Sequence, residues 1–135
     1  MLGLASLTLT VNLAHATACV GGHLPSELKA GGEYWQECAH VLVGERTPVG
    51  EFPAMYAIVH QPGYRGHVVA FHETETEMFS VHGLYEGDEA SKSFREKAIK
   101  KKPKYRKAVS NGCVNVPWAF FDQYGPKITK VVITK

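Results

Sequence analysis

Short runs rich in β-branched and aromatic residues recur along this chain, and glycine or proline bounds each of them. Such runs are typical of β-strands, and Gly and Pro mark the turns between strands. Most intervals between neighbouring runs are too short to hold the crossover helices of βαβ units. The pattern predicts a mainly β fold with antiparallel or mixed sheets, with strands within residues 39–43, 54–60, 67–72, 78–82 and 128–134.

Two helices are predicted in the C-terminal part. Asp88 can cap a helix that Pro103 ends, with basic residues in its last turn. Its apolar face is formed by residues at a spacing of four: Ala90, Phe94 and Ala98. Pro117 opens a second helix that ends at Gly125. Its aromatic residues belong in the core: Trp118, Phe120, Phe121 and Tyr124.

The N-terminal residues have two interpretations. A small, apolar stretch runs into two overlapping Ala-x-Ala sites, which predicts a signal peptide over residues 1–18 and a single domain over 19–135. No Lys or Arg precedes the stretch, which suggests a truncated start. The alternative is a first strand, because four apolar residues alternate with polar ones: Leu7, Leu9, Val11 and Leu13. The stretch is shorter than the ~20 residues of a membrane-spanning helix, and no transmembrane segment is predicted.

Three cysteines are present, Cys19, Cys38 and Cys113. In an oxidising compartment an odd number is most simply one disulfide and one free thiol. Cys19 and Cys38 can pair, with a lipidated or free Cys19 as the alternatives. Cys113 is then the thiol that stays free.

Positive charge is concentrated in one segment. The chain carries a formal charge of +2, yet residues 95–107 hold eight basic residues and one acid. Nucleic-acid-binding proteins of this size spread basic residues over a face, so no nucleic acid is predicted as a partner. The sequence leaves the oligomeric state open.

The segment from Ser110 to Pro117 places Cys113 in a tight turn just before a helix. Main-chain N–H groups in such a turn can favour a thiolate and bind a developing oxyanion. The base must come from elsewhere, and His82 is the best candidate because it ends a strand pattern and is followed by Gly83. No His-Glu-x-x-His or paired Cys-x-x-Cys spacing occurs, so no metal site is predicted. A cysteine nucleophile with a histidine base needs no other cofactor, and none is predicted.

Three stretches, in this order, resemble the L,D-transpeptidases of peptidoglycan, the YkuD-type catalytic domain. They are Val43-Gly-Glu-Arg-Thr-Pro-Val-Gly-Glu-Phe52, Val81-His-Gly83, and Lys107-Ala-Val-Ser-Asn-Gly-Cys-Val-Asn115. The likeness covers about residues 39–135. It implies a β-sandwich-like catalytic fold with one helix between His82 and Cys113 and a short helix after Cys113.

The resemblance also implies residue roles. Cys113 is the nucleophile, His82 the base, and the main chain of Gly83 orients His82. Amides near Gly112 and Cys113 form the oxyanion hole, in a loop shaped by further residues: Ser110, Asn111 and Asn115. Many members have His where Asn111 stands, so a second imidazole is missing here.

The 28 positions between His82 and Ser110 are more than in many members and contain the basic run. The run is interpreted either as a solvated helix end or as a lid or substrate rim. The rim residues are Lys101, Lys102, Tyr105 and Arg106.

The resemblance implies acyl transfer on tetrapeptide stems through a thioester on Cys113, in the periplasm or cell envelope of a bacterium. Terminal D-alanine is released, and an amine takes the acyl group. An L,D-carboxypeptidase or an antibacterial effector of the same fold, using water or a D-amino acid as acceptor, is the alternative. A wall-binding domain without catalysis is the non-enzyme alternative. Papain-like enzymes are less consistent with the chain order because no histidine follows Cys113, and sortases are less consistent because no arginine does.

Overall fold

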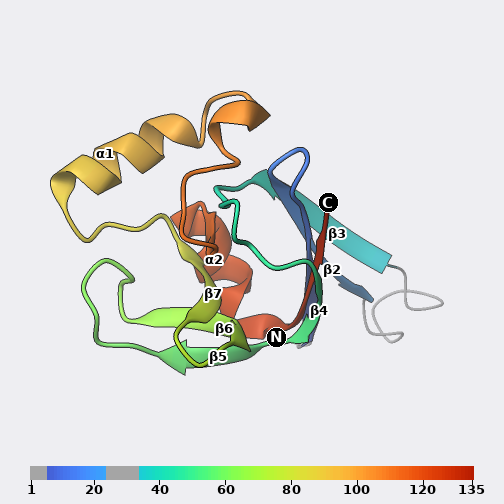
Figure 1. The fold of residues 1–135 in the computed structure, drawn as a ribbon. Coiled ribbons are helices and arrows are strands. Elements are labelled where there is room, and N and C mark those ends of the chain that lie inside the picture. Colours follow the sequence, from blue (N-terminus) through green and yellow to red (C-terminus); the bar gives the residue numbers. More distant parts are fainter. Residues whose placement is uncertain (1–5, 24–33) are drawn as a thin grey trace.

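The computed structural model describes residues 6–23 and 34–135. Its strands form two sheets (Figure 1). The first has five strands in the order β3-β2-β1-β9-β4. Their bounds are Leu7–Asn12 for β1, Thr17–His23 for β2, Tyr34–His40 for β3, Gly50–Pro53 for β4 and Ile128–Thr134 for β9. β1 and β9 are parallel, and the other pairs are antiparallel.

The second sheet has four strands in the order β5-β6-β7-β8. They are β5 (Met55–Ile58), β6 (His67–Glu73), β7 (Met78–Gly83) and β8 (Val114–Val116). β8 lies parallel to β7, and the other two pairs are antiparallel. The prediction of a mainly β fold with mixed sheets is confirmed.

The alternation in the N-terminal segment is that of a strand. β1 lies between β2 and β9, and its three inward side chains are fully buried: Leu7, Leu9 and Val11. Residues 1–5 of the segment interpreted as a signal peptide lie outside the described residues. Residues 7–18 supply β1 and the start of β2, so their removal would leave β9 without its parallel partner.

The disulfide links the two strands at the edge of this sheet. Cys19 in β2 and Cys38 in β3 are directly paired in register and joined by a disulfide bond. Cys113 is the free cysteine.

The main core lies between the two sheets and includes α2 (Trp118–Tyr124). Phe120, Phe121 and Tyr124 are buried there, as predicted, and the Tyr124 ring lies 5.3 Å from the Trp35 ring of β3. The described residues also form two single-turn 3-10 helices, η1 (Pro103–Tyr105) and η2 (Gly125–Lys127).

α1 (Glu89–Ala98) begins at Asp88, whose carboxylate accepts from the Ser91 amide at 2.7 Å, as the cap prediction requires. The predicted apolar face is wrong in part. Ala98 is buried, but Phe94 is 55% exposed and Ala90 is exposed. The helix lies at the margin of the fold (Figure 1) and joins a small second core of Leu42, Leu84 and Ala98 by its last turn, which leaves its first turns in solvent.

The run at 39–43 is not one strand. β3 ends at His40, and the next three residues turn inward. Leu42 forms an isolated antiparallel bridge with Asn115, and Val43 bonds to the segment before Cys113. This run therefore supports the cysteine loop. In the described part of the chain, no helix is long and apolar enough to cross a membrane.

Candidate active site

The parallel pair β7–β8 brings the two candidate catalytic residues to one face. In its register Val81 is opposite Val114, and His82 is opposite Asn115. Alternate residues of a strand share a face, so Ser80 and His82 lie beside Cys113 and Asn115. Ser80 Oγ lies 3.7 Å from Cys113 Sγ, which fits this placement.

The loop before β8 is closed by Ser110. Its Oγ donates to the main-chain oxygen of Cys113 at 2.6 Å and accepts from the Gly112 amide at 3.1 Å. Gly112 has φ +120°, and a Cβ there would overlap the ring of Phe79. Because Ser110 Oγ engages the Gly112 N–H in this structure, this amide would have to exchange that partner to bind an oxyanion, and the oxyanion hole near Gly112 and Cys113 stays a prediction. The Cys113 amide has no partner among the described residues.

The Gly-x-x-Thr-Pro stretch supports this loop and contributes no side chain to the pocket. Val43 O accepts from the Val109 and Ser110 amides at 2.9 and 3.2 Å. A Cβ on Gly44 would overlap Ser110 O, so only glycine allows this approach. Thr47 Oγ1 accepts from the Gly44 amide at 3.0 Å and closes the turn. The stretch therefore has a structural role at this loop.

His82 is 3% exposed, and its Nδ1 lies 2.6 Å from the Gly83 carbonyl oxygen. A carbonyl only accepts, so Nδ1 carries the proton and Nε2 keeps a lone pair. Burial lowers the His82 pKa to about 4, and the Arg95 charge adds a smaller lowering. The hydrogen bond to Gly83 acts in the opposite direction and raises the pKa, but it does not outweigh burial. The imidazole is neutral at pH 7 and can accept a proton through Nε2.

Gly83 has a second task besides this hydrogen bond. A Cβ there would overlap the ring of Trp118, whose Nε1 donates to Leu84 O at 2.8 Å. The absence of a side chain lets α2 pack directly against the end of β7, which fixes the backbone that carries His82.

Tyr64 lies edge-on to His82, with ring centroids 4.7 Å apart, and comes from the β5–β6 loop. The adjacent Arg65 forms two 2.8 Å hydrogen bonds with Glu86, which tie this loop to the segment after β7. Burial is the main cause that raises the pKa of the Tyr64 hydroxyl, so it stays protonated and can donate.

Arg95 of α1 reaches the site from the other side. Its Nε donates to Asn115 Oδ1 at 3.2 Å, and the Tyr85 amide donates to the same oxygen at 3.2 Å. Both partners are donors, which fixes the orientation of the Asn115 amide. Its Nδ2 is buried and has no partner among the described residues. The Arg95 guanidinium lies 5.3 Å from the centre of the Tyr85 ring.

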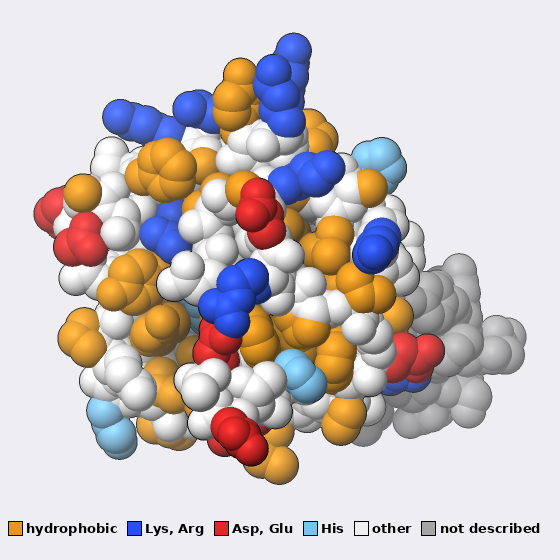
Figure 2. Space-filling model, viewed as in Figure 1, with side chains coloured by type: hydrophobic (Ala, Val, Ile, Leu, Met, Phe, Trp, Pro, Cys, Tyr) orange, Lys and Arg blue, Asp and Glu red, His pale blue; other side chains and the backbone are white. Residues whose placement is uncertain are grey.

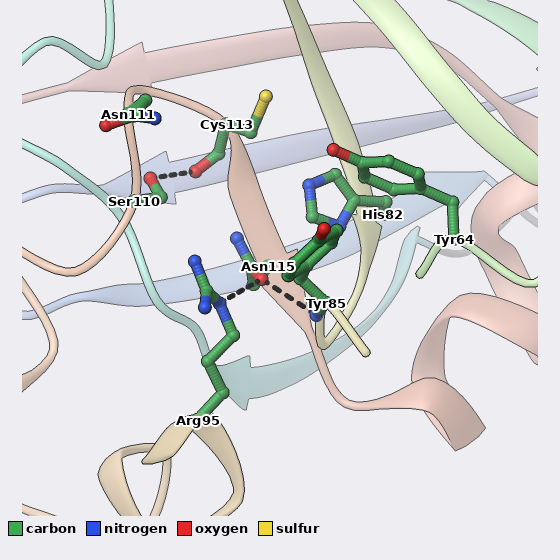
Figure 3. A pocket seen from close by; sticks show the side chains of 8 residues that line it. All are labelled: Tyr64, His82, Tyr85, Arg95, Ser110, Asn111, Cys113 and Asn115. Atoms are coloured by element: carbon green, nitrogen blue, oxygen red, sulfur yellow. Dashed lines mark hydrogen bonds between the residues drawn. The ribbon is translucent and has the colours of Figure 1, made fainter. Parts of the chain in front are cut away.

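These residues line one pocket of about 290 Å³. Figure 3 shows them: Tyr64, His82, Tyr85, Arg95, Ser110, Asn111, Cys113 and Asn115. A second pocket of about 200 Å³ shares Tyr64 and Cys113 and has a more apolar wall, with Val59, Val68 and Met78. Cys113 therefore lies between two hollows of different character.

The thiol and the imidazole line the same pocket but are not hydrogen-bonded. Cys113 Sγ contacts Ser80 Oγ and lies 3.9 Å from Met78 O, and the described residues include no hydrogen bond from it to His82. A ring nitrogen of His82 faces the Cys113 side of the pocket (Figure 3). Rotation about the Cα–Cβ bond of Cys113 is the movement that changes the partner of the sulfur.

The predicted rim residues lie elsewhere. Lys101, Lys102 and Tyr105 are exposed and do not line the pocket, and the ammonium groups of Lys101 and Lys104 lie over the Tyr105 ring. Basic side chains gather at the top of the molecule, near α1 and the segment after it (Figure 2).

Arg106 is 1% exposed and cannot form a rim. It donates to the main-chain oxygens of His15, Ala16 and Lys101. These carbonyls offset the cost of burying its charge, so Arg106 joins the basic segment to the β1–β2 turn.

Sequence reasoning missed Tyr64, Tyr85 and Arg95. In the sequence Arg95 is only the first basic residue of the basic run, and no sequence motif marks Tyr64 or Tyr85 as part of a site. Within residues 6–23 and 34–135, no group of three or more His, Cys, Asp or Glu side chains could hold a metal ion.

The sequence matches no protein-family model and no curated protein. Among solved structures, the fold matches the helical cell shape determining protein Pgp2 from Campylobacter jejuni. The TM-score is 0.57 at 12% sequence identity, over 96% of this chain and 47% of that one. The chain thus spans about half the length of this neighbour, and the likeness shows a shared fold.

Proposed function

We propose that this chain is a cysteine-dependent L,D-transpeptidase that acts on tetrapeptide stems of peptidoglycan. The observation that carries the proposal is one pocket lined by the free thiol of Cys113 and by His82, a neutral imidazole held by Gly83. The three sequence stretches that resemble this family support it. The shared fold with a protein named for determining cell shape also supports a wall substrate, because the wall sets bacterial shape.

In the proposed reaction the thiol first rotates from Ser80 toward His82 and gives its proton to Nε2. The sulfur attacks the carbonyl before the terminal D-alanine and forms a C–S bond, and the Cys113 amide donates to the oxyanion. The C–N bond then breaks, and the imidazolium protonates the leaving amine. The low pKa of His82 makes the imidazolium a strong acid, so it readily transfers this proton to the amine. An acceptor amine takes the acyl group from the thioester and releases the thiol.

The two hollows beside Cys113 offer one space to the leaving residue, which the incoming amine then occupies because it needs the same base, and another to the acyl part of the stem. The Cys19–Cys38 disulfide fits an oxidising compartment, so we place the reaction outside the cytoplasm.

The test is intact-mass analysis after addition of a carbapenem, combined with release of D-alanine from a stem tetrapeptide. We expect one covalent adduct on the parent protein and none on Cys113→Ala. His82→Gln should slow D-alanine release about 10²- to 10⁴-fold without unfolding the protein. Full release by Cys113→Ala would end the proposal. Analysis of the products formed with and without an added amine distinguishes transfer of the acyl group to the amine from its hydrolysis by water.

A further inference from the structure

We propose that Arg95 binds the free C-terminal carboxylate of the substrate, which restricts the site to peptides with a single residue after the cleaved bond. This inference rests on the proposed function, because it assigns the ends of the same substrate.

The first support is the set of unused donors on Arg95. A guanidinium has five N–H groups, and in the described residues only Nε is engaged, by Asn115. No described carboxylate forms an ion pair with Arg95, whereas Arg65 is paired with Glu86. Its half-buried position and the contacts with Asn115 and Tyr85 hold it at the pocket. A fixed guanidinium with free N–H groups matches the two oxygens of a carboxylate.

The second support is the direction that the chemistry imposes. His82 must protonate the leaving amine, so the leaving residue lies in the pocket that holds His82. In an α-amino acid only one carbon separates the amine from the carboxyl carbon, so the carboxylate falls in this same space. Arg95 is the one cation among the residues that line it.

The inference also defines which substrates the site should bind less tightly. A substrate amidated at the C-terminus, or extended beyond D-alanine, would leave the guanidinium without its anion. The buried Asn115 Nδ2 adds a second donor without a partner beside this space.

Binding without turnover tests the inference separately from the reaction. In Cys113→Ala, calorimetry compares a stem tetrapeptide that ends in free D-alanine with the same peptide as its C-terminal amide. We expect the acid to bind about 10- to 100-fold more tightly, because hydrogen bonds to charged groups are worth this much. Adding Arg95→Gln should remove the preference and leave the affinity for the amide. Adding Lys97→Gln, which removes the same charge from an exposed position of α1, should preserve it.

Equal affinities for acid and amide in Cys113→Ala would overturn the inference, as would a preference that survives Arg95→Gln. No binding of either peptide at millimolar concentration would overturn it as well. If the preference depends on Arg95 but the parent protein releases no D-alanine, the reaction is wrong and the carboxylate site stands. Thermal unfolding of each variant verifies that it is folded.

Discussion

Ser80 Oγ in β7 lies 3.7 Å from Sγ of Cys113, the residue before β8, although the two are 33 positions apart in the sequence. His82 is two residues further along β7, on the same face. The sulfur therefore rests against Ser80 and Met78 of β7, and in the proposed reaction His82 of the same strand takes its proton.

Ser80→Ala should make Cys113 react faster. Loss of the hydroxyl removes a weak contact of the thiol, so the rotamer that faces His82 gains population. We expect a few-fold rise in the rate of alkylation by iodoacetamide, since such contacts contribute about 1 kcal/mol or less. The same substitution in His82→Gln should bring no rise. A slower reaction of Ser80→Ala would contradict the proposed resting contact.

His82 should make the folded state less stable in acid. Its pKa falls from 6.5 to about 4 on folding, so between these values the unfolded chain binds more protons than the folded one. The stabilisation is complete above pH 6.5 and is lost as the pH falls toward 4, by about 3 kcal/mol in total. Urea titrations from pH 7 to 4 measure it.

His82→Gln provides the comparison, because glutamine does not titrate. The loss of stability between pH 6.5 and 4 should become distinctly smaller in this variant than in the parent protein. If the free energy of unfolding falls with pH equally in both proteins, the pKa of His82 is not lowered by folding and the prediction is wrong.

Gly112→Ala should destabilise the cysteine loop. The residue has φ +120°, where a side chain is strained, and the new Cβ would overlap the Phe79 ring. Strain of this kind costs about 1–3 kcal/mol. Gly66→Ala is the matched control, since Gly66 has φ +89° with nothing within 4 Å of an added Cβ.

The two alanine variants should differ in both stability and reactivity. We expect Gly112→Ala to have the lower Tm and an altered rate of alkylation at Cys113, and Gly66→Ala to keep the parent rate. Equal losses of Tm in Gly112→Ala and Gly66→Ala would mean that the overlap of the new Cβ with Phe79 does not contribute to the destabilisation.

Residues 7–18 should be needed for folding. Leu9→Ala creates a cavity at a fully buried position of β1 and should cost about 2–5 kcal/mol, whereas Thr10→Ala, on the exposed face, should cost little. A chain that starts at Cys19 should fail to give the cooperative thermal transition of the full chain. A normal transition would show instead that β1 is dispensable and that removal of residues 1–18 is compatible with the fold.

The sequence alone predicted features that depend on neighbours along the chain. The Asp88 cap, the helix after Pro117 and most of the predicted strands follow from local periodicity and turn residues, and they agree with the structure, whereas β2, β4 and β8 were not predicted. Cys113 and His82 could be selected because a glycine-containing turn and a strand end are also local features. The prediction that Cys113 lies just before a helix is wrong, because β8 lies between Cys113 and α2. The N-terminal sequence favours a leader and leaves a strand as the alternative, because both need only a short apolar stretch.

Only the tertiary structure distinguished among the charges of the basic run. Arg95 lines the pocket, Arg106 is buried against three carbonyls, and Lys101 lies in solvent. Local sequence gives these cations the same character, because the position of a charged side chain depends on which distant groups meet it after the strands pair. The register of β7 with β8 and the packing of α1 on Leu84 decide where each of these side chains lies, and both depend on partners outside the run.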